Sequence, residues 1–407
     1  MGVGELMSEN RAYVSRLKSE ISDRFVGNEE AVDVIVLNLL HRRSTALVRA
    51  PRGTGKSTLM LLLLKGLFGD EFVVISGASE VKRGEVIGRL HIPSLEREGT
   101  ERVLWAKFVE APGKGIDEVN RLNPYTTANV HHLMQFGEVW AYGQRQSVSD
   151  FTLIANENPS DTTTFMQPPP FYDRFDVCVY LNSLTLSQKF ELQDKERKYA
   201  EALVESMPQV MDAETLDGIR KEVSEVELDA DLQGLINVLV RDFQSCVRNK
   251  EHSEVSPPVL CDGCHFTRFV CSSVKEPPSE RATLVLSQLA RAKMWLTGSV
   301  SRDDVLNMAK WVLVHRMTLA RPRNLINDLN ELIEREKERM HERDSRGQWL
   351  ILNELYSSFK PGLYKTAREI AVEDNVFAEE LFALEARWVR EGKLSREETL
   401  MATAETR

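Results

Sequence analysis

Residues 50–57, with the sequence APRGTGKS, have the residue types and the spacing of a loop that binds phosphate groups. Gly53 and Gly55 let the backbone turn and approach a ligand closely, so that successive amide groups can point at phosphate oxygens. Lys56 adds a positive charge, and Ser57 offers a hydroxyl group to a magnesium ion that bridges the same phosphates. The pattern predicts a site for a nucleoside triphosphate with Mg²⁺. The residues predicted to bind it are Arg52, Gly53, Thr54, Gly55, Lys56, Ser57 and Thr58.

The segments on either side of this loop support the same interpretation. An apolar run at residues 45–49 can form a strand before the loop, and residues 59–65 can form a helix after it. Ala50 stands where the pattern has its first glycine, which permits the loop only if this residue keeps a negative φ. The alternative is a glycine-rich turn that binds no nucleotide. The lysine, the hydroxyl group and both flanking segments favour nucleotide binding.

An acidic pair, Asp117 and Glu118, follows the loop along the chain. If Ile116 ends a strand beside the loop, Asp117 can hold the magnesium shell, and Glu118 can orient or deprotonate the attacking water. The preceding residues 111–115, APGKG, make a poor strand by composition. An exposed acidic turn is therefore the alternative for this pair.

The acidic pair opens the first of four motifs that follow the loop in order. These motifs are residues 117–121 (DEVNR), 155–159 (ANENP), 173–175 (DRF) and 279–281 (SER). Together with the loop, they resemble the MoxR-type AAA+ ATPases, in the magnesium-chelatase-like branch of the AAA+ proteins, from about residue 25 to residue 316. The resemblance implies an α/β fold, in which a P-loop NTPase αβα sandwich, the AAA+ core, is followed by an all-α lid.

The resemblance also implies roles for single residues. Asn158 would be the sensor-1 residue, which hydrogen-bonds the γ-phosphate or the attacking water. Arg174 would be the arginine finger that is donated to the nucleotide of a neighbouring subunit, and Arg281 would be sensor 2. Val26 and Gly27 match the place where such proteins bind the adenine ring. For each arginine, membership of a surface ion pair is the alternative.

An arginine that acts on a neighbour's nucleotide implies an oligomer, which in this family is usually a hexameric ring. The resemblance further implies an ATPase that uses ATP and Mg²⁺ to remodel, activate or metal-load a client protein, often with a separate partner that carries a von Willebrand factor A (VWA) domain. Two alternatives stay open, a DNA-translocating AAA+ motor and a nucleotide-gated assembly scaffold with little turnover. The net charge of -10 favours a protein client over nucleic acid, because phosphate neutralisation needs a basic surface.

Two segments look like the insertions that mark this branch of the AAA+ proteins. Residues 86–110 and residues 138–148 would each form a hairpin, and the residues around Gly143 independently predict a β-turn. In relatives these hairpins project toward the axis of the ring. Their aromatic residues Trp105, Trp140 and Tyr142 could contact a substrate, and packing in the core is the alternative for them.

Apolar runs that alternate with helical segments predict the order of the elements. Strand candidates are residues 45–48, 72–75, 151–155 and 177–180, an arrangement typical of a parallel sheet with helices on both faces. Beyond residue 184 helical periodicity dominates. The expected divisions are an N-terminal helix (1–24), the AAA+ core (25–184), the lid with a cysteine-containing insertion (185–322), a linker helix (323–345) and a C-terminal module (346–407).

Four of the five cysteines lie within the expected lid. Cys261 and Cys264 are separated by two residues, which lets both sulfur atoms reach one tetrahedral zinc ion, and Cys246 with Cys271 could complete the site. A helix that buries its cysteines as small apolar residues is an equal alternative. His265 after Cys264 also spells a haem attachment string, but a reduced cytoplasmic setting argues against it.

The composition of the 407-residue chain is that of an ordinary globular protein. No apolar run approaches the roughly 20 residues that span a bilayer, and residues 1–9 lack the features of a secretory signal, so we expect a cytoplasmic protein with reduced thiols. Residues 346–407 predict three short helices in a winged-helix-like outline, with a plain helical cap as the alternative. This segment holds nine Lys or Arg against eleven Asp or Glu, which favours protein docking over DNA binding.

Overall fold

The computed structural model describes residues 3–78, 80–148, 150–161, 165, 167–244, 270–320, 322–345 and 348–399. The chain divides into two compact units. One is formed by Met1–Val226 with Arg291–Ser299, and the other by Glu227–Ala290 with Val300–Arg407. In the part of the chain described, no helix is both long and apolar enough to cross a membrane.

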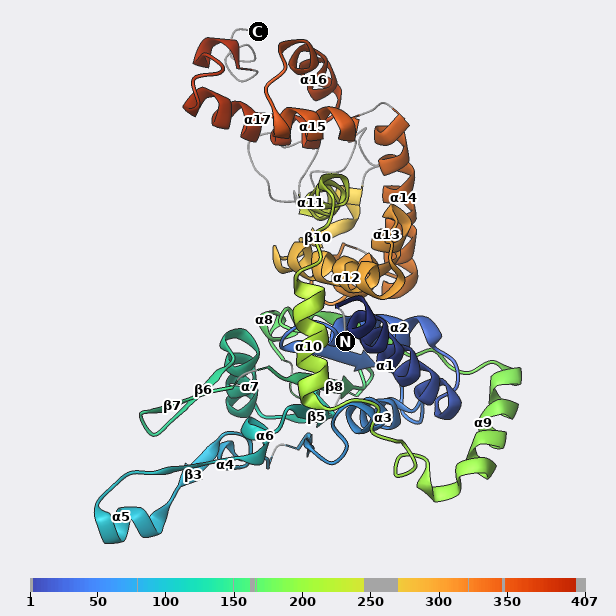
Figure 1. The fold of residues 1–407 in the computed structure, drawn as a ribbon, viewed down its shortest axis with the longest axis vertical. Helices are drawn as coiled ribbons and strands as arrows, with labels where there is room; N and C mark the ends of the chain where they lie inside the picture. The colour runs from blue at the N-terminus through green and yellow to red at the C-terminus, as the bar shows by residue number, and fades with distance from the viewer. Residues whose placement is uncertain are drawn as a thin grey trace. The chain divides into compact units, whose positions relative to one another are not determined.

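The first unit is built on a five-stranded sheet with the order β2-β5-β8-β1-β9, in which all neighbouring strands are parallel (Figure 1). Its strands are β1 (Ser44–Arg49), β2 (Phe72–Ser76), β5 (Gly113–Asp117), β8 (Thr152–Glu157) and β9 (Val177–Tyr180). Nearly every residue of β1 and all residues of β8 are buried. Since alternate side chains point to opposite faces, both faces of the sheet are covered. The predicted α/β class and the four predicted strands are confirmed.

Helices surround this sheet, and local sequence explains where several of them begin and end. The helix α7 begins where the Asn123 side chain accepts a hydrogen bond from the Thr126 amide, with Pro124 in the first turn, and it ends before Gly137, which has a φ of 66°. The helices of the first unit are α1 (Val3–Arg24), α2 (Glu29–Leu39), α3 (Lys56–Phe68), α4 (Arg83–Val86), α5 (Ile92–Glu98), α6 (Lys107–Glu110), α7 (Pro124–Phe136), α8 (Pro169–Tyr172), α9 (Leu186–Tyr199) and α10 (Ala213–Ser224).

The strand β5 forms despite the poor strand composition of its sequence. It pairs with β2 on one side and β8 on the other. A Cβ atom at Gly113 would lie 2.6 Å from the Phe68 ring, and one at Gly115 would lie 2.8 Å from Val74 and 3.1 Å from the Met60 sulfur. The glycines therefore allow α3 and the neighbouring strand to approach closely, and this packing outweighs their low strand propensity.

Both predicted insertions form hairpins that extend from the sheet of this unit (Figure 1). In the first, β3 (Gly88–Leu90) pairs antiparallel with β4 (Val103–Trp105), and α5 lies between them along the chain. In the second, β6 (Glu138–Ala141) pairs with β7 (Gln144–Ser147). Trp140 and Tyr142 are 48% and 50% exposed, so core packing does not account for them, whereas Trp105 is only partly exposed.

The second unit is predominantly helical. Its helices are α11 (Ala230–Gln244), α12 (Arg281–Thr297, which belongs to the first unit from Arg291 onward), α13 (Arg302–Leu313), α14 (Leu325–Ser345), α15 (Gln348–Ser357), α16 (Pro361–Glu373) and α17 (Asn375–Arg390). A two-stranded antiparallel ribbon of β10 (Val274–Glu276) and β11 (Thr318–Leu319) is the one sheet among its described residues, an element that the expectation of an all-helical lid did not include.

The C-terminal helices α15, α16 and α17 share a hydrophobic core of their own. Leu355, Leu381, Leu384 and Trp388 are almost completely buried in it. Residues 348–399 contain no strand, so the three predicted helices are present and no wing accompanies them in this segment. This arrangement agrees with a helical cap better than with a winged helix.

One lysine is fully buried in the first unit. The Lys114 ammonium group donates hydrogen bonds to the carbonyl oxygens of Phe108 (2.6 Å), Val109 (3.1 Å) and Ala111, in and just after α6. It also lies 5.6 Å from the ring centres of Phe108 and Phe151. Burial lowers the pKa of Lys114 to about 7, because a low-dielectric interior disfavours the charged form.

We expect Lys114 to make stability depend on pH. The pKa is 10.5 when the lysine is exposed and about 7 in the folded chain, so between these values the unfolded chain binds more protons. Stability should therefore rise with pH between about 7 and 10, by up to about 1.4 kcal/mol per pH unit. In urea unfolding, the free energy of unfolding should rise less between pH 7 and pH 9 for Lys114→Met than for the wild type.

The matched control is Lys107→Met, which removes an exposed lysine of α6 and should keep the wild-type pH dependence. A Lys114→Met chain that gains as much stability between pH 7 and pH 9 as the wild type would contradict this explanation.

Candidate active site

The predicted phosphate-binding loop joins β1 to α3. Gly53 and Gly55 have φ values of 76° and 85°, which favour glycine, and Ala50 keeps a negative φ, as the sequence requires. The Lys56 ammonium group donates to the carbonyl oxygens of Ala50 and Pro51, at 2.8 Å each. Burial lowers the pKa of Lys56, while Asp117 and Glu118 raise it.

Ser57 and Asp117 meet beside this loop. The Ser57 hydroxyl donates a 2.9 Å hydrogen bond to Asp117 Oδ1, because Ser57 lies in the first turn of α3 and Asp117 is the last residue of β5. A hydroxyl and a carboxylate oxygen are ligands that Mg²⁺ prefers, and the triphosphate supplies further oxygens. These two side chains fit a magnesium ion bound together with a nucleotide.

Glu118 follows β5 in an unusual backbone conformation. Its φ is 56°, in the left-handed region, and its amide donates a 2.9 Å hydrogen bond to Asn156 Oδ1. The Glu118 carboxylate lies 2.9 Å from Arg121 Nη1, and the Glu118 side chain is 34% exposed. The acidic pair is therefore placed by the end of a buried strand and is not a freely exposed turn.

Asn158 and Asn156 lie at the end of β8 and beyond it. Asn158 is 7% exposed, and its Oδ1 accepts a 3.2 Å hydrogen bond from the Ser160 amide. Asn156 is fully buried, and its Nδ2 has no hydrogen-bond partner among the described residues. Asn156 was not among the predicted site residues, although it belongs to the same ANENP motif.

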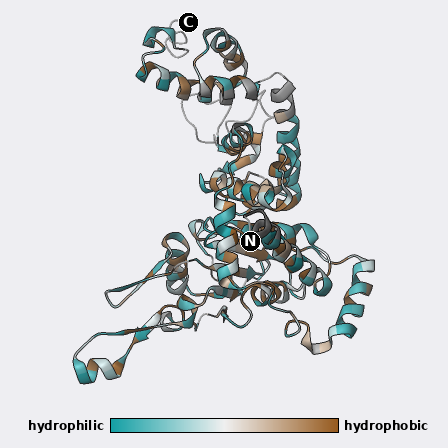
Figure 2. Ribbon diagram, in the orientation of Figure 1, coloured by the Kyte–Doolittle hydropathy of each residue, from teal (hydrophilic) through white to brown (hydrophobic). Residues whose placement is uncertain are grey.

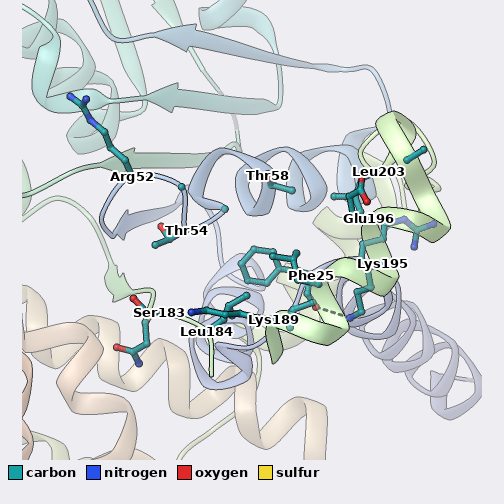
Figure 3. A pocket seen from close by; sticks show the side chains of 17 residues that line it. Phe25, Arg52, Thr54, Thr58, Ser183, Leu184, Lys189, Lys195, Glu196 and Leu203 are labelled. Atoms are coloured by element: carbon teal, nitrogen blue, oxygen red, sulfur yellow. Dashed lines mark hydrogen bonds between the residues drawn. The ribbon is translucent and has the colours of Figure 1, made fainter. Parts of the chain in front are cut away.

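A pocket of about 490 Å³ opens beside the loop (Figure 3). On one side it is lined by Arg52, Gly53, Thr54, Gly55 and Thr58. The other side is formed by Arg24, Phe25, Val26, Asn182, Ser183, Leu184, Lys189, Leu192, Lys195, Glu196, Ala200 and Leu203. The structure thus brings most of the predicted loop residues and Val26 to one cavity. Its apolar end, at Phe25 and Leu184, suits a flat base, and its loop end suits phosphates.

Gly27 does not line this pocket. It lines a second pocket of about 270 Å³, and a Cβ atom at Gly27 would lie 2.9 Å from Gln188 Nε2. Its place is therefore between the end of α1 and the start of α9. The predicted contact of Gly27 with the adenine ring stays a prediction.

The helix α9 borders the pocket although none of its residues is buried, and it is mostly hydrophilic (Figure 2). Polar contacts attach it to the end of α1. Lys195 Nζ donates to the carbonyl oxygens of Ser22 (2.6 Å) and Phe25 (3.1 Å), and Lys198 pairs with Asp23 at 2.9 Å. Sequence periodicity could not reveal this placement, because it depends on charged side chains and not on an apolar face.

Arg174 is held within its own chain. Its side chain is 15% exposed, and its guanidinium group donates to Gln135 Oε1 (2.9 Å) and to the Pro170 carbonyl oxygen (2.8 Å). An arginine finger that reaches a neighbouring subunit would have to leave both acceptors. Arg281, at the start of α12, belongs to the second unit, and its role as sensor 2 stays a prediction.

The zinc prediction falls mainly outside the described residues. Cys246, Cys261 and Cys264 are not among them, and only the backbone of Cys271 is described. Among the described residues, no group of three or more His, Cys, Asp or Glu side chains could hold a metal ion. Cys178, which we assigned to the core, is fully buried.

Comparison with known proteins agrees with this geometry. Residues 47–175 match the family described as "AAA domain (dynein-related subfamily)". The chain contains an AAA domain. The solved structure of a "putative ATPase" from Cytophaga hutchinsonii has a similar fold, with a TM-score of 0.65 and 18% sequence identity over 81% of this chain and 95% of that chain. No curated protein matches the sequence. The AAA domain supports ATPase activity for this chain.

The packing of Gly55 makes nucleotide binding by the AAA domain testable. A Cβ atom at Gly55 would lie 3.0 Å from the Phe25 ring, at a φ of 85°. We expect Gly55→Ala to weaken binding of a fluorescent ATP analogue by about tenfold or more, because the strained loop moves or Phe25 is displaced.

Gly143→Ala is the matched control. Gly143 also has a positive φ, 73°, but a Cβ atom there would meet nothing within 4 Å. Its nucleotide affinity should equal that of the wild type. Unchanged affinity in Gly55→Ala would mean that this loop does not hold the nucleotide.

Proposed function

We propose that this chain is a MoxR-type AAA+ ATPase that hydrolyses MgATP in an oligomeric ring. The observation that carries the proposal is the convergence of Ser57, Asp117 and Glu118 at one end of the sheet, next to the phosphate-binding loop. The AAA domain match and the pocket beside the loop support it.

In this proposal each residue has a distinct task. Lys56 and the loop amides bind the β- and γ-phosphates, and Ser57 and Asp117 hold Mg²⁺, which neutralises charge on the phosphate oxygens. Glu118 orients the attacking water and accepts its proton. Asn158, near the same end of the sheet, contacts the γ-phosphate or the water.

Ring assembly follows from the proposed role of Arg174. A guanidinium group stabilises the charge that develops on the transferred phosphoryl group, and a finger in trans makes activity depend on a neighbour. We propose a hexameric ring in which Arg174 exchanges its bonds to Gln135 and Pro170 for contact with the adjacent nucleotide. Arg281 would act as sensor 2 in the same site.

The proposed work of the ring is to remodel, activate or metal-load a client protein in the cytoplasm, as a chaperone does. A separate VWA-domain protein would present the client. Support comes from the net charge of -10, which disfavours nucleic acid, and from the exposed Trp140 and Tyr142 on the β6–β7 hairpin.

Replacement of Glu118 tests the catalytic assignment. Glu118→Gln keeps the size of the side chain and one acceptor oxygen but lacks the negative charge and cannot accept a proton, so phosphate release should fall by about 100-fold or more while ATP still binds. Steady-state phosphate release and a binding titration measure the two effects separately. Turnover at the wild-type rate would remove Glu118 from the mechanism. A wild-type chain that binds ATP without releasing phosphate would instead be a nucleotide-gated scaffold.

A mixing experiment tests the finger. Arg174→Ala should lose hydrolysis by about 1,000-fold or more, and Lys56→Ala should lose it through failure to bind ATP. Mixed rings place an intact Arg174 beside an intact Lys56 of another subunit, so mixtures should recover activity that neither variant has alone.

Gln135→Ala removes the same internal contact but keeps the arginine, and it should stay active. Mixtures that assemble, as judged by size-exclusion chromatography, and still hydrolyse no ATP would contradict an arginine finger in trans.

A further inference from the structure

Asp161 connects three of the motifs around the candidate active site. Its Oδ2 lies 2.7 Å from Arg121 Nη2 and 3.4 Å from Arg52 Nη2. Its amide donates a 3.1 Å hydrogen bond to the Asn158 carbonyl oxygen. The Asp161 carboxylate therefore contacts the phosphate-binding loop and the DEVNR motif, and the Asp161 amide contacts the turn after β8.

Arg121 holds a second carboxylate with the other arm of its guanidinium group. Its Nη1 lies 2.9 Å from Glu118 Oε2, while its Nη2 contacts Asp161. The planar guanidinium fork fixes the directions of both pairs, which a lysine ammonium group cannot do. The Asp161 hydrogen bond raises the pKa of Arg121, so the cation is always present.

Burial strengthens one side of this arrangement. The Asp161 side chain is 4% exposed, whereas those of Arg121 and Glu118 are 33% and 34% exposed. An ion pair with one buried partner is less screened by water and salt than a surface pair. Asp161 can therefore act as the fixed point from which Arg121 reaches the more exposed Glu118.

Glu118 needs such a restraint if it is to act on water. A glutamate side chain with free rotamers loses up to about 2 kcal/mol of conformational entropy when it is fixed in one geometry. Asn156 fixes only the Glu118 backbone, through its amide. Arg121 is the described residue that fixes the carboxylate.

We propose that Arg121 is a positioning residue for hydrolysis, which holds the Glu118 carboxylate in its working orientation, and that Asp161 holds Arg121. The inference rests on the proposed role of Glu118. Without Asp161, the guanidinium group of Arg121 would lose its more buried partner and would hold the Glu118 carboxylate less firmly.

The same contacts link nucleotide binding to this positioning. Arg52 lines the nucleotide pocket, and its side chain points away from Phe25 and α9 (Figure 3). Its distance to Asp161 is the longer of the two, and it is 72% exposed. A bound triphosphate attracts Arg52, which leaves Asp161 Oδ2 to Arg121.

Steady-state ATPase kinetics of single and double variants test the proposal. Arg121→Met should lower kcat by about tenfold or more with the KM for ATP within about twofold of the wild type, because positioning affects the chemical step and not binding. Arg121→Lys keeps a cation but cannot span both carboxylates, so it should retain part of the lost rate. Asp161→Asn should also lower kcat, and the double variant Arg121→Met/Asp161→Asn should be no slower than Arg121→Met.

The decisive arm repeats Arg121→Met in the Glu118→Gln background, where residual turnover is followed with radiolabelled ATP. If Arg121 acts through Glu118, the substitution has no further effect there. A general structural role would lower the rate by the same factor in both backgrounds and would overturn the proposal. A raised kcat in Arg121→Met would also overturn the proposal, since the ion pair of Arg121 with Glu118 would then slow hydrolysis.

Arg42→Met is the matched control, because it removes another arginine–aspartate pair of this unit, Arg42 with Asp150 at 3.3 Å, and it should keep the wild-type kcat. If the wild type is active and Arg121→Met has the same kcat as the wild type, this inference is overturned and the proposed function is not. Wild-type protein without phosphate release, or Glu118→Gln at full rate, overturns the proposed function and this inference with it.

Discussion

The geometry of the candidate site depends on how closely α3 packs against β5. Ser57 lies in the first turn of α3 and Asp117 is the last residue of β5, and their 2.9 Å contact exists only at a short distance between helix and strand. Gly113 and Gly115 provide that distance, because a side chain at either position would meet Phe68, Met60 or Val74. A larger residue in β5 would raise strand propensity and separate Ser57 from Asp117, the two proposed magnesium ligands. The short distance between α3 and β5 is thus required both for the packing of the core and for the geometry of the candidate site.

A second constraint is that polar groups at the ends of β5 and β8 are fixed before any ligand arrives. Glu118 has a left-handed backbone, which is costly for a residue with a side chain, and the buried Asn156 stabilises it through a hydrogen bond to its amide. Asn156 leaves its own Nδ2 without a partner among the described residues. A strained backbone and an unsatisfied buried amide are unfavourable for folding, and at a site proposed to orient water they would provide preorganisation.

The elements whose structure depends on hydrophobic pattern were predictable from the sequence. The elements and contacts that depend on packing or charge were not. The strands at Thr45 and Phe72 are apolar, and the hairpin turn at Gly143 has its own signature, so these elements were predictable. The strand β5 was not predictable, because its glycines allow α3 to pack closely and do not themselves favour a strand. The residue types of the site could be predicted from spacing, but not the contacts of Arg121 with Glu118 and Asp161, since such ion pairs join residues that only the fold brings together.

The spacing of the motifs alone could not settle how Arg174 would contact a neighbouring subunit. Its motif position suggests a projecting finger, yet its guanidinium group is bonded to Gln135 and Pro170 of the same chain. Gln135 lies in the last turn of α7, and the β6–β7 hairpin with its exposed Trp140 begins two residues after that helix ends. Gln135, which accepts a hydrogen bond from Arg174, and the hairpin are therefore parts of one short continuous segment. A contact that moves this hairpin would act directly on Gln135, so in the proposed ring the binding of a client and the release of Arg174 would be physically connected.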